Sequence, residues 1–388
     1  MNNFILENST KTVFGEGCVK EYLASFAGDY GPNVLLAYGG GSARRSGVYY
    51  EVYRILRAAG KTVAEFANIS PNPTYALVRE GAKTALERHV DLILALGGGS
   101  VVDWCKVVSM AAVYRGDFWE DFWARQGVVD FEPLPVGAIP TTTGTGSERN
   151  GRAFLSSGET RGKIGRNYPK CTPRFALLDP SYTLTLPPSE MVGGGFDAFS
   201  RVMEIYFSPP EEETVSDDLS EAIMRGLVRD LRASVQRSDN YAARSNLMWE
   251  AVVAGDPLPA LGKRAAFPCR RIARRLWAAT GCGYTSCLAA VQLAYYRRRC
   301  LLSPGKFARF ARRVWELPPE GRSEEALGRA GVDALEGFLM ELGLPRSLRE
   351  AGIPAEENLA DLVGRPAAPE EKLGLTQEEL LQLLQDAH

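Results

Sequence analysis

A fifteen-residue segment, GGGFDAFSRVMEIYF, places an acid and a guanidinium four positions apart within a pattern of helical period. Asp197, Arg201 and Glu204 fall on one face, because spacings of four and seven residues return to the same side of a helix. The opposite face carries the apolar side chains Phe199, Val202, Met203 and Tyr206. Two interpretations stay open. The pair is either an ordinary helix ion pair worth a few tenths of a kcal/mol, or part of a buried site in which fixed positive charge acts on a ligand.

Glycine loops are the second feature that could do chemistry. Gly97–Ser100 follow the apolar run LILAL and precede a helical pattern, and the loop YGGGSARRSG, residues 38–47, has the same context. Glycine lets a backbone approach a ligand closely, and a helix N-terminus offers free N–H groups to a phosphate. Neither loop matches G-x-G-x-x-G, but two such loops together favour nucleotide binding. A third segment, IPTTTGTGSERNGRAF, is either a hydrogen-bonded turn or the lip of that site.

The elements that must position these groups divide the chain in two. Up to about residue 186, continuous apolar runs alternate with helical patterns, which predicts a parallel sheet covered on both faces. From 187 onward nearly every segment has helical period, and Pro187 and Pro188 mark the change. We therefore expect an α/β nucleotide-binding domain over 1–186 and an all-α domain over 187–388.

Composition limits the function classes. The 388 residues are 45% hydrophobic and 24% charged with a net charge of -2, so nothing draws the chain toward nucleic acid or a membrane. No apolar run approaches the roughly 20 residues that a membrane span needs, and residues 1–15 lack a secretion signal. Seven scattered cysteines suit reduced thiols in the cytoplasm. The sequence has two histidines, His89 and His388.

The order of several motifs over nearly the whole chain resembles the iron-containing (group III) alcohol dehydrogenases, in particular the butanol dehydrogenase and aldehyde reductase branch. The segments that carry the resemblance are TKTVFGEG (10–17), PNP (71–73), GGGSVVDWCK (97–106), PTTTGTGSE (140–148), LLDPSYTLTLPP (177–188) and GFDAFSRVMEIY (195–206). The fold implied is the dehydroquinate synthase-like one, with a dinucleotide-binding α/β domain and a helical domain.

The resemblance also implies where a nicotinamide dinucleotide would bind. Gly98, Gly99, Ser100 and Asp103 would hold the pyrophosphate and nearby ribose. The nicotinamide side would be lined by Thr141, Thr142, Thr145 and Ser147, and Lys163 would reach a ribose hydroxyl.

Cofactor choice depends on the loop after the first buried strand. Family members that prefer NAD place an acid there, which binds the adenosine ribose and repels a 2′-phosphate. This chain has Gly39, Gly40, Gly41 and Ser42 instead, followed by Arg44 and Arg45. A missing acid and two guanidinium groups favour NADP over NAD, unless the arginines are merely solvated charges.

The family's metal ligands are an aspartate, a histidine four residues later and two further histidines fourteen apart. Asp197 matches the aspartate, but Arg201, Arg270 and Tyr284 stand at the three histidine positions, and Arg274 replaces a further histidine often assigned to proton relay. A guanidinium has no lone pair to donate and stays protonated. We therefore predict no metal at the family position.

Thiolates are the remaining candidate donors. Cys269, Cys282 and Cys287 lie near the former ligand positions in sequence. Their spacing matches no known ligand pattern, and Cys269 would point roughly 100° away from Arg270 on a helix. We expect buried apolar thiols, although metal binding by these cysteines stays open.

Two hypotheses follow. The first is an NADP(H)-dependent alcohol or aldehyde oxidoreductase working without metal, in which Arg201 or Arg270 polarises the carbonyl or binds an anionic substrate group, with Asp197 beside them and Tyr284 as proton donor. The second is a catalytically silent nucleotide-binding homologue with a regulatory or structural role. In either case we expect a homodimer or higher homo-oligomer, and no nucleic-acid partner.

Overall fold

The computed structural model describes residues 1–388 except 145, 157–162, 355–358, 360–362 and 364–374. The chain forms two compact units. The α/β unit contains Glu7–Gly194 and Asp239–Asp256, and the helical unit contains Met1–Leu6, Gly195–Ser238 and Pro257–His388. The helix Tyr241–Gly255 therefore belongs to the α/β unit, so the compact units do not coincide with a single division after residue 186.

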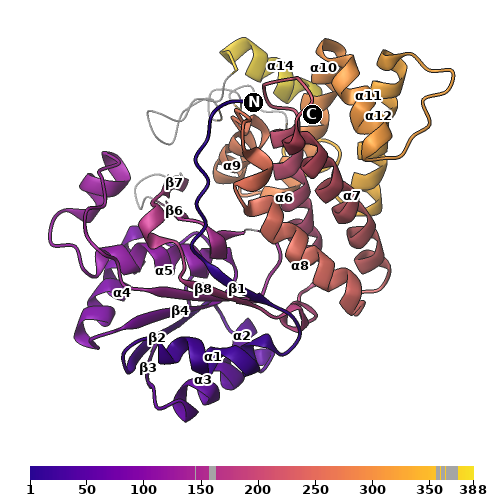
Figure 1. Cartoon of the computed structure of the whole chain (residues 1–388). Coiled ribbons are helices and arrows are strands. Elements are labelled where there is room, and N and C mark those ends of the chain that lie inside the picture. Colours follow the sequence, from indigo (N-terminus) through magenta and orange to yellow (C-terminus); the bar gives the residue numbers. More distant parts are fainter. Residues whose placement is uncertain (145, 157–162, 355–358, 360–362, 364–374) are drawn as a thin grey trace. The chain divides into compact units, whose positions relative to one another are not determined.

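A six-stranded parallel sheet forms the centre of the α/β unit (Figure 1). Its strand order is β1-β8-β5-β4-β2-β3, and the strands are β1 (Lys11–Phe14), β2 (Asn33–Tyr38), β3 (Thr62–Phe66), β4 (Leu92–Gly97), β5 (Val136–Pro140) and β8 (Phe175–Leu178). Every residue of β4, β5 and β8 is buried. The continuous apolar runs of the sequence are thus strands covered on both faces, as predicted.

Helices pack on both faces of this sheet, and β2 shows how the faces separate. Leu35 and Ala37 join one apolar core, while Val34 and Leu36 point into the other, as the two-residue period of a strand requires. The first core includes α4 (Tyr75–Glu87) and α5 (Gly99–Ala111), and the second includes α1 (Cys18–Gly28) and α3 (Val48–Ala58).

Two further parts complete the α/β unit. An antiparallel pair, β6 (Arg152–Ser156) and β7 (Lys163–Asn167), follows the hydroxyl-rich segment. Helix α8 (Tyr241–Gly255) returns from later in the chain, and its buried Arg244 donates to the carbonyl of Thr183. The apolar contact of Leu178, Met248 and Val252 joins α8 to the end of β8.

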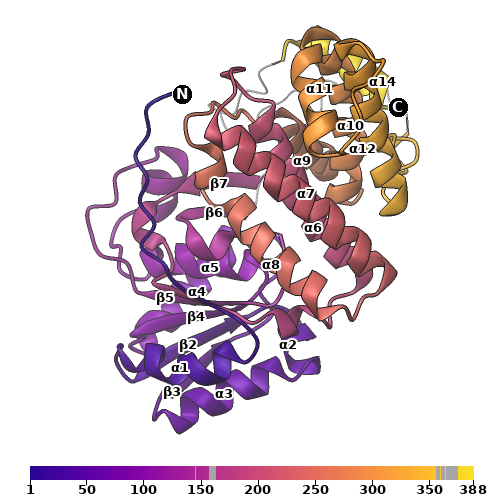
Figure 2. The same ribbon diagram turned by 45° about the vertical axis from the view of Figure 1, so that its right-hand side comes forward.

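The second unit is helical, as predicted. Helix α6 (Pro188–Tyr206) runs into it from the α/β unit. The remaining described helices are α7 (Val215–Gln236), α9 (Pro268–Thr280), α10 (Tyr284–Leu302), α11 (Pro304–Arg313), α12 (Glu324–Glu341) and α14 (Gln377–Ala387). In the views of Figures 1 and 2, α9 lies beside α10 and α11 beside α12.

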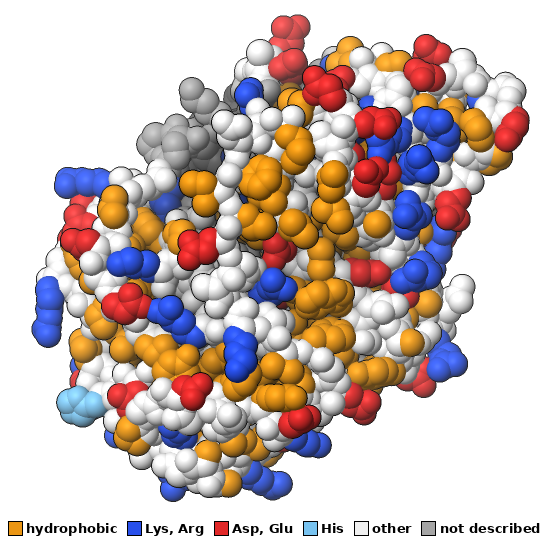
Figure 3. Space-filling model, in the orientation of Figure 1, with side chains coloured by type: hydrophobic (Ala, Val, Ile, Leu, Met, Phe, Trp, Pro, Cys, Tyr) orange, Lys and Arg blue, Asp and Glu red, His pale blue; other side chains and the backbone are white. Residues whose placement is uncertain are grey.

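Basic and acidic side chains are interspersed on the surface of the helical unit, as Figure 3 shows over α11 and α12. Two arginines from the run at 297–299 are paired: Arg297 with Glu336 at 2.6 Å and Arg298 with Asp386 at 2.9 Å. This part of the basic sequence is therefore balanced locally by acids. Among the described residues, no helix combines the length and apolar character that crossing a membrane requires.

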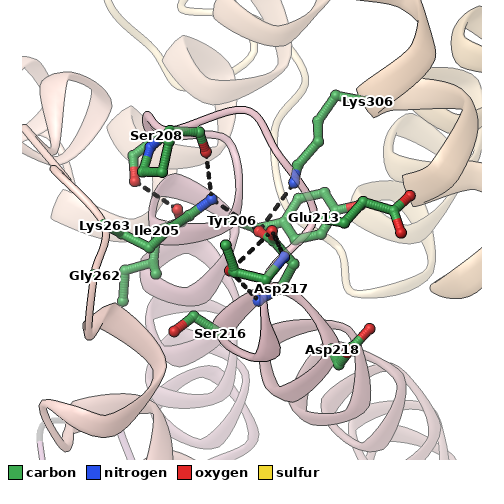
Figure 4. Close-up of polar contacts among 12 residues, drawn as sticks. Ile205, Tyr206, Ser208, Glu213, Ser216, Asp217, Asp218, Gly262, Lys263 and Lys306 are labelled. Atoms are coloured by element: carbon green, nitrogen blue, oxygen red, sulfur yellow. Dashed lines mark hydrogen bonds and ion pairs between the residues drawn. The ribbon is translucent and has the colours of Figure 1, made fainter. Parts of the chain in front are cut away.

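A buried ionic cluster joins three elements of the helical unit (Figure 4). Lys263, in the loop before α9, and Lys306, in α11, each place Nζ 2.9 Å from Oδ1 of Asp217 in α7. The side chains of Lys263 and Asp217 are fully buried. Lys306 also lies over the Tyr206 ring, 4.3 Å from its centroid. One carboxylate thus holds two ammonium groups, which is tolerated in a core because each charge has a partner.

Candidate functional site

The first glycine loop lies where β4 ends and α5 begins. Gly98 is the residue before the first helical turn, and a Cβ atom built on it would stand 3.0 Å from the hydroxyl oxygen of Thr142. The glycine therefore keeps a small hollow open, with Gly97, Gly99, Thr142 and Met248 among its lining. The free N–H groups of the first turn of α5 and a backbone without side chains suit the pyrophosphate of a dinucleotide.

Two residues predicted to hold the cofactor have their polar groups engaged inside the protein. Asp103 is buried, and it accepts a 2.5 Å hydrogen bond from the Ser147 hydroxyl and another, 3.1 Å long, from the N–H of Phe154. These bonds tie the hydroxyl-rich segment to α5. In the structure Asp103 and Ser147 therefore shape the loop, and direct contact of either with a cofactor stays a prediction.

Lys106 completes this connection, and sequence reasoning gave it no role. Its fully buried ammonium donates to the Ser147 hydroxyl at 2.7 Å and to the Arg152 carbonyl at 2.8 Å. Burial lowers the pKa of Lys106, although the charge of Asp103 opposes this shift. The sequence feature that could have revealed this role is the position of Lys106 one helical turn after Asp103, which puts both side chains on the same face of α5.

The other predicted residues of this region are placed as follows. Ser100 lies in the first turn of α5, and its hydroxyl accepts from the N–H of Asn72 at 3.4 Å. Thr141 and Thr142 come directly after β5. Thr145 lies outside the described residues. Lys163 is the first residue of β7 and pairs with Ser156 of β6. The structure does not describe its side chain.

The second glycine loop follows β2 at the same edge of the sheet. Tyr38 is paired in register with Leu96, so the loops after β2 and β4 start side by side. Gly39, Gly40 and Gly41 lead into the short helix α2 (Ser42–Arg45). Arg45 folds back over the loop, because a Cβ on Gly41 would stand 2.6 Å from its Nη1. Both arginines belong to α2, directly after the loop where the adenosine ribose was predicted to bind.

In the helical unit, α6 and α9 bring an acid and two arginines together. Arg270 contacts Asp197 with both terminal nitrogens: Nη1 lies 2.7 Å from Oδ1, and Nη2 lies 2.9 Å from Oδ2. Nη1 also donates to the backbone carbonyl of Asp197 at 2.9 Å. Arg201 stands 3.7 Å from Oδ2, which confirms the i,i+4 pair. All three side chains are at most 15% exposed, so this is a mostly buried cluster rather than a solvated face.

The protonation of this cluster follows from its charges. Burial by itself raises the pKa of Asp197, but the charges of Arg270 and Arg201 outweigh it and the pKa lies below its ordinary value. Tyr284, the first residue of α10, also bonds to this carboxyl group. Burial raises the pKa of Tyr284. Asp197 is therefore a carboxylate and Tyr284 a neutral phenol across the neutral pH range.

Glu204 lies two turns further along α6, and its role was not foreseen. It is 5% exposed and accepts the backbone N–H of Cys269 at 2.8 Å, in the first turn of α9. Burial raises its pKa to about 7, against the opposing charge of Arg270. In the same helix, Arg274 Nε donates to the carbonyl of Arg270 at 3.1 Å. Glu204 thus fixes the start of the helix that carries both arginines.

These side chains do not fit a metal ion. The carboxylate of Asp197, which was predicted to match the family's aspartate ligand, is already bound by Arg270, and guanidinium groups offer no lone pairs. Of the three cysteines, Cys269 and Cys287 are buried, and the Cys282 thiol contacts the carbonyl of Ala351 at 3.3 Å. Among the described residues, no three His, Cys, Asp or Glu side chains come together as a metal site would require.

The fold and the glycine loops define the class of protein: an α/β unit suited to nucleotide binding, joined to a helical unit with a polar cluster on α6 and α9. The chain belongs to the iron-containing alcohol dehydrogenase family. The family model for iron-containing alcohol dehydrogenases matches residues 9–180, and the model for the C-terminal part of the Fe-containing family matches residues 191–388.

Individual relatives resemble the chain along its length. The probable NADH-dependent butanol dehydrogenase 1 of Bacillus subtilis is 32% identical over 386 residues, covering 99% of each chain. The NADPH-dependent aldehyde reductase YqhD of Escherichia coli is 33% identical over 356 residues, covering 91% of this chain and 90% of the reductase. Among solved structures, NADH-dependent butanol dehydrogenase A of Thermotoga maritima superposes with a TM-score of 0.90 at 32% identity, covering 100% of this chain and 99% of that one.

Proposed function

We propose that this protein is an NADP(H)-dependent alcohol or aldehyde oxidoreductase that works without the family's metal and prefers an anionic aldehyde. Its family membership and its similarity to butanol dehydrogenases and an aldehyde reductase support the reaction class. The observation that carries the metal-free part is the pairing of Arg270 and Arg201 with Asp197.

The arginines differ in what they can contribute. Arg270 is committed to Asp197 by both terminal nitrogens, so we assign it the task of holding the carboxylate. Arg201 makes a longer, 3.7 Å contact with the same group, and we assign it the carbonyl oxygen of the substrate. A fixed guanidinium stabilises the negative charge that develops on that oxygen as hydride reaches the carbon.

The proton that completes the alcohol would come from Tyr284. Its raised pKa keeps the phenol protonated, and the hydroxyl group would turn from its hydrogen bond with Asp197 to the substrate oxygen to deliver its single proton. Loss of the proton would be assisted by the positive charge of Arg270 and Arg274, both of which lower the pKa of Tyr284. The nicotinamide of the bound cofactor supplies or accepts the hydride in this reaction.

Charge supports an anionic substrate. Among the described residues, Arg201, Arg270 and Arg274 are balanced by Asp197 and by Glu204, whose pKa of about 7 leaves it partly neutral. Three arginines beside two acids are the reason that we propose an anionic substrate. A carboxylate or phosphate on the aldehyde would meet these guanidinium groups, and a charge-assisted hydrogen bond to such a group contributes about 1.5–3 kcal/mol.

A matched pair of aldehydes tests the proposal. We expect NADPH-dependent reduction of a four-carbon aldehyde with a terminal carboxylate to exceed that of butanal by at least about tenfold in kcat/KM, as the energy of one charged hydrogen bond implies. Added Fe²⁺ or Zn²⁺ should leave both rates unchanged. Activity that appears only with a metal, or that favours butanal, would contradict the proposal.

The second candidate is a catalytically silent nucleotide-binding homologue. It is favoured by the same observation, since the glycine loops are present while Arg201, Arg270 and Tyr284 stand where the resemblance would place the metal-binding histidines. Binding of NADPH with no turnover over a panel of neutral and acidic aldehydes would support it.

The cofactor and assembly belong to this proposal too. The loop Gly39–Ser42 has no acid and is followed by two arginines, which supports NADP over NAD.

A homodimer or larger homo-oligomer is supported by the edge position of β1 and by exposed apolar residues before it, including Ile5 at 95% exposure. Light scattering on the purified protein tests the assembly. We propose no nucleic-acid partner and a cytoplasmic location.

A further inference from the structure

Arg44, in the short helix after the second glycine loop, is held by three side chains of the α/β unit. Its Nη2 donates to Oε2 of Glu65 at 2.9 Å and to the Tyr38 hydroxyl at 2.5 Å. The guanidinium carbon lies over the Tyr49 ring, 4.5 Å from its centroid. Contacts at one end and a ring beneath it restrict a side chain that is otherwise flexible.

The group that anchors Arg44 is Glu65, near the end of β3. Its Oε2 also accepts from the Tyr38 hydroxyl at 2.7 Å. Partial burial raises the pKa of Glu65, but the bonds from Tyr38 and Tyr49 and the charge of Arg44 outweigh it, so the pKa lies below its ordinary value. Glu65 is therefore a stable carboxylate, and its position relative to Arg44 is fixed.

This cluster lies where a dinucleotide's adenosine end is expected. In doubly wound sheets the pyrophosphate binds at the helix after one strand, and the adenosine ribose lies at the end of the neighbouring strand. Here those strands are β4 and β2, paired through Tyr38 and Leu96. Arg44 comes two residues after the glycine and serine loop, and its side chain is 47% exposed.

We infer that Arg44 binds the 2′-phosphate of NADP and that Glu65 is the positioning residue that orients it. Glu65 and Tyr38 accept hydrogen bonds from Nη2. On the other edge of the guanidinium, Nε and Nη1 have no hydrogen bond to a described residue and can meet a phosphate with two parallel N–H groups. The inference rests on the proposed function, because it specifies how the same cofactor site selects NADP.

Arg45 is less suited to this role. It is exposed and lies over the backbone of Gly41, and no described carboxylate or aromatic ring contacts its guanidinium. An unrestrained side chain loses more conformational entropy when it binds a ligand. The difference between the neighbouring arginines is therefore one of preorganisation.

Binding of adenosine 2′,5′-bisphosphate and of 5′-AMP to the whole protein, measured by calorimetry, tests the inference without requiring turnover. We expect the bisphosphate to bind more tightly by about 10- to 100-fold, the range of one charged bidentate contact. Arg44→Leu should abolish this preference, whereas 5′-AMP should bind the variant as it binds the original protein. Arg54→Leu, which removes an exposed arginine from α3, is the control for loss of charge.

Glu65→Gln separates positioning from folding. This substitution should weaken binding of the bisphosphate by about three- to tenfold, because Arg44 loses its orientation, and should change the affinity for 5′-AMP by no more than about twofold. A loss that is equal for both ligands would mean a structural role. Weaker binding of 5′-AMP alone would mean that Glu65 binds the ribose hydroxyls. Either result overturns the inference.

The outcomes also separate this inference from the proposed function. If the bisphosphate preference depends on Arg44 but no aldehyde is reduced, the inference holds and the oxidoreductase proposal fails. If aldehydes are reduced equally well with NADH and NADPH, and Arg44→Leu has no effect on either, the inference fails while the oxidoreductase proposal stands. Failure to bind either ligand would contradict both.

Discussion

Arg270 and Asp197 form a two-point ion pair, with 2.7 Å between Nη1 and Oδ1 and 2.9 Å between Nη2 and Oδ2. The pair connects α9 to α6 within the helical unit. A buried pair of this kind is costly to break from one side, since the remaining charge is left without its partner.

Asp197→Asn should therefore destabilise the protein by about 3 kcal/mol. The amide keeps the shape of the side chain but cannot balance Arg270. Urea unfolding measures the loss, and the double variant Asp197→Asn with Arg270→Met should recover part of it. Additive losses in the double variant would show that the two side chains are not coupled.

Arg201→Met should separate chemistry from stability. Removing one oxyanion-type donor lowers kcat by about 100- to 1,000-fold, whereas Asp197 keeps its closer partner Arg270 in this variant and is not left without a counterion. We expect aldehyde reduction to fall with a small change in Tm. Lys83→Met, which removes a highly exposed lysine of the α/β unit, is the control and should leave kcat unchanged. Unchanged kcat in Arg201→Met would remove this residue from the mechanism.

Glu204 should make stability depend on pH. Its folded pKa of about 7 is raised from 4.5, so the folded state holds a proton that the unfolded chain has released. The stabilisation is complete below about pH 4.5 and is lost as pH rises through 7, a change of about 3 kcal/mol. Glu204→Gln keeps the acceptor for the Cys269 N–H and should flatten this part of the profile. The two proteins are compared by urea unfolding at pH values from about 5 to about 8. Parallel profiles for the two proteins would contradict the assignment.

Metal removal should have no effect. Because Arg201 and Arg270 both contact Asp197, we expect dialysis against a chelator to leave both Tm and NADPH-dependent activity unchanged. Elemental analysis of the protein before dialysis should find less than one Fe or Zn per chain. A stoichiometric metal whose removal lowers Tm would contradict the metal-free proposal, and Cys269→Ser would then test the thiols.

The cluster around Asp217 predicts a stability effect away from the candidate site. Lys263→Met leaves Asp217 with Lys306 as its remaining ammonium partner and should destabilise the protein by about 1–3 kcal/mol, the cost of a disrupted buried contact. Asp217→Asn leaves two buried ammonium groups without a counterion and should cost more, about 3–5 kcal/mol. Denaturant unfolding measures both variants. The reverse order would contradict the assignment of Asp217 as the shared counterion.

The sequence by itself determined the two kinds of unit and one ion pair of the candidate site. Continuous apolar runs such as LILALG favour strands inside a covered sheet, and helical periods of apolar residues favour a helical core. The return of α8 to the α/β unit did not follow from local pattern. The spacing of Asp197 and Arg201 likewise fixed their ion pair, because a helix places such residues side by side.

Only the tertiary structure decided which partners these groups meet. Arg270 comes from a helix more than seventy residues away, and no local period predicts that both of its terminal nitrogens reach Asp197. Glu65 was overlooked for the same reason, since strand pairing and the packing of Tyr49, not sequence distance, bring it to Arg44. Local spacing specifies the faces of elements, whereas the distances between charges on different elements depend on how the elements pack.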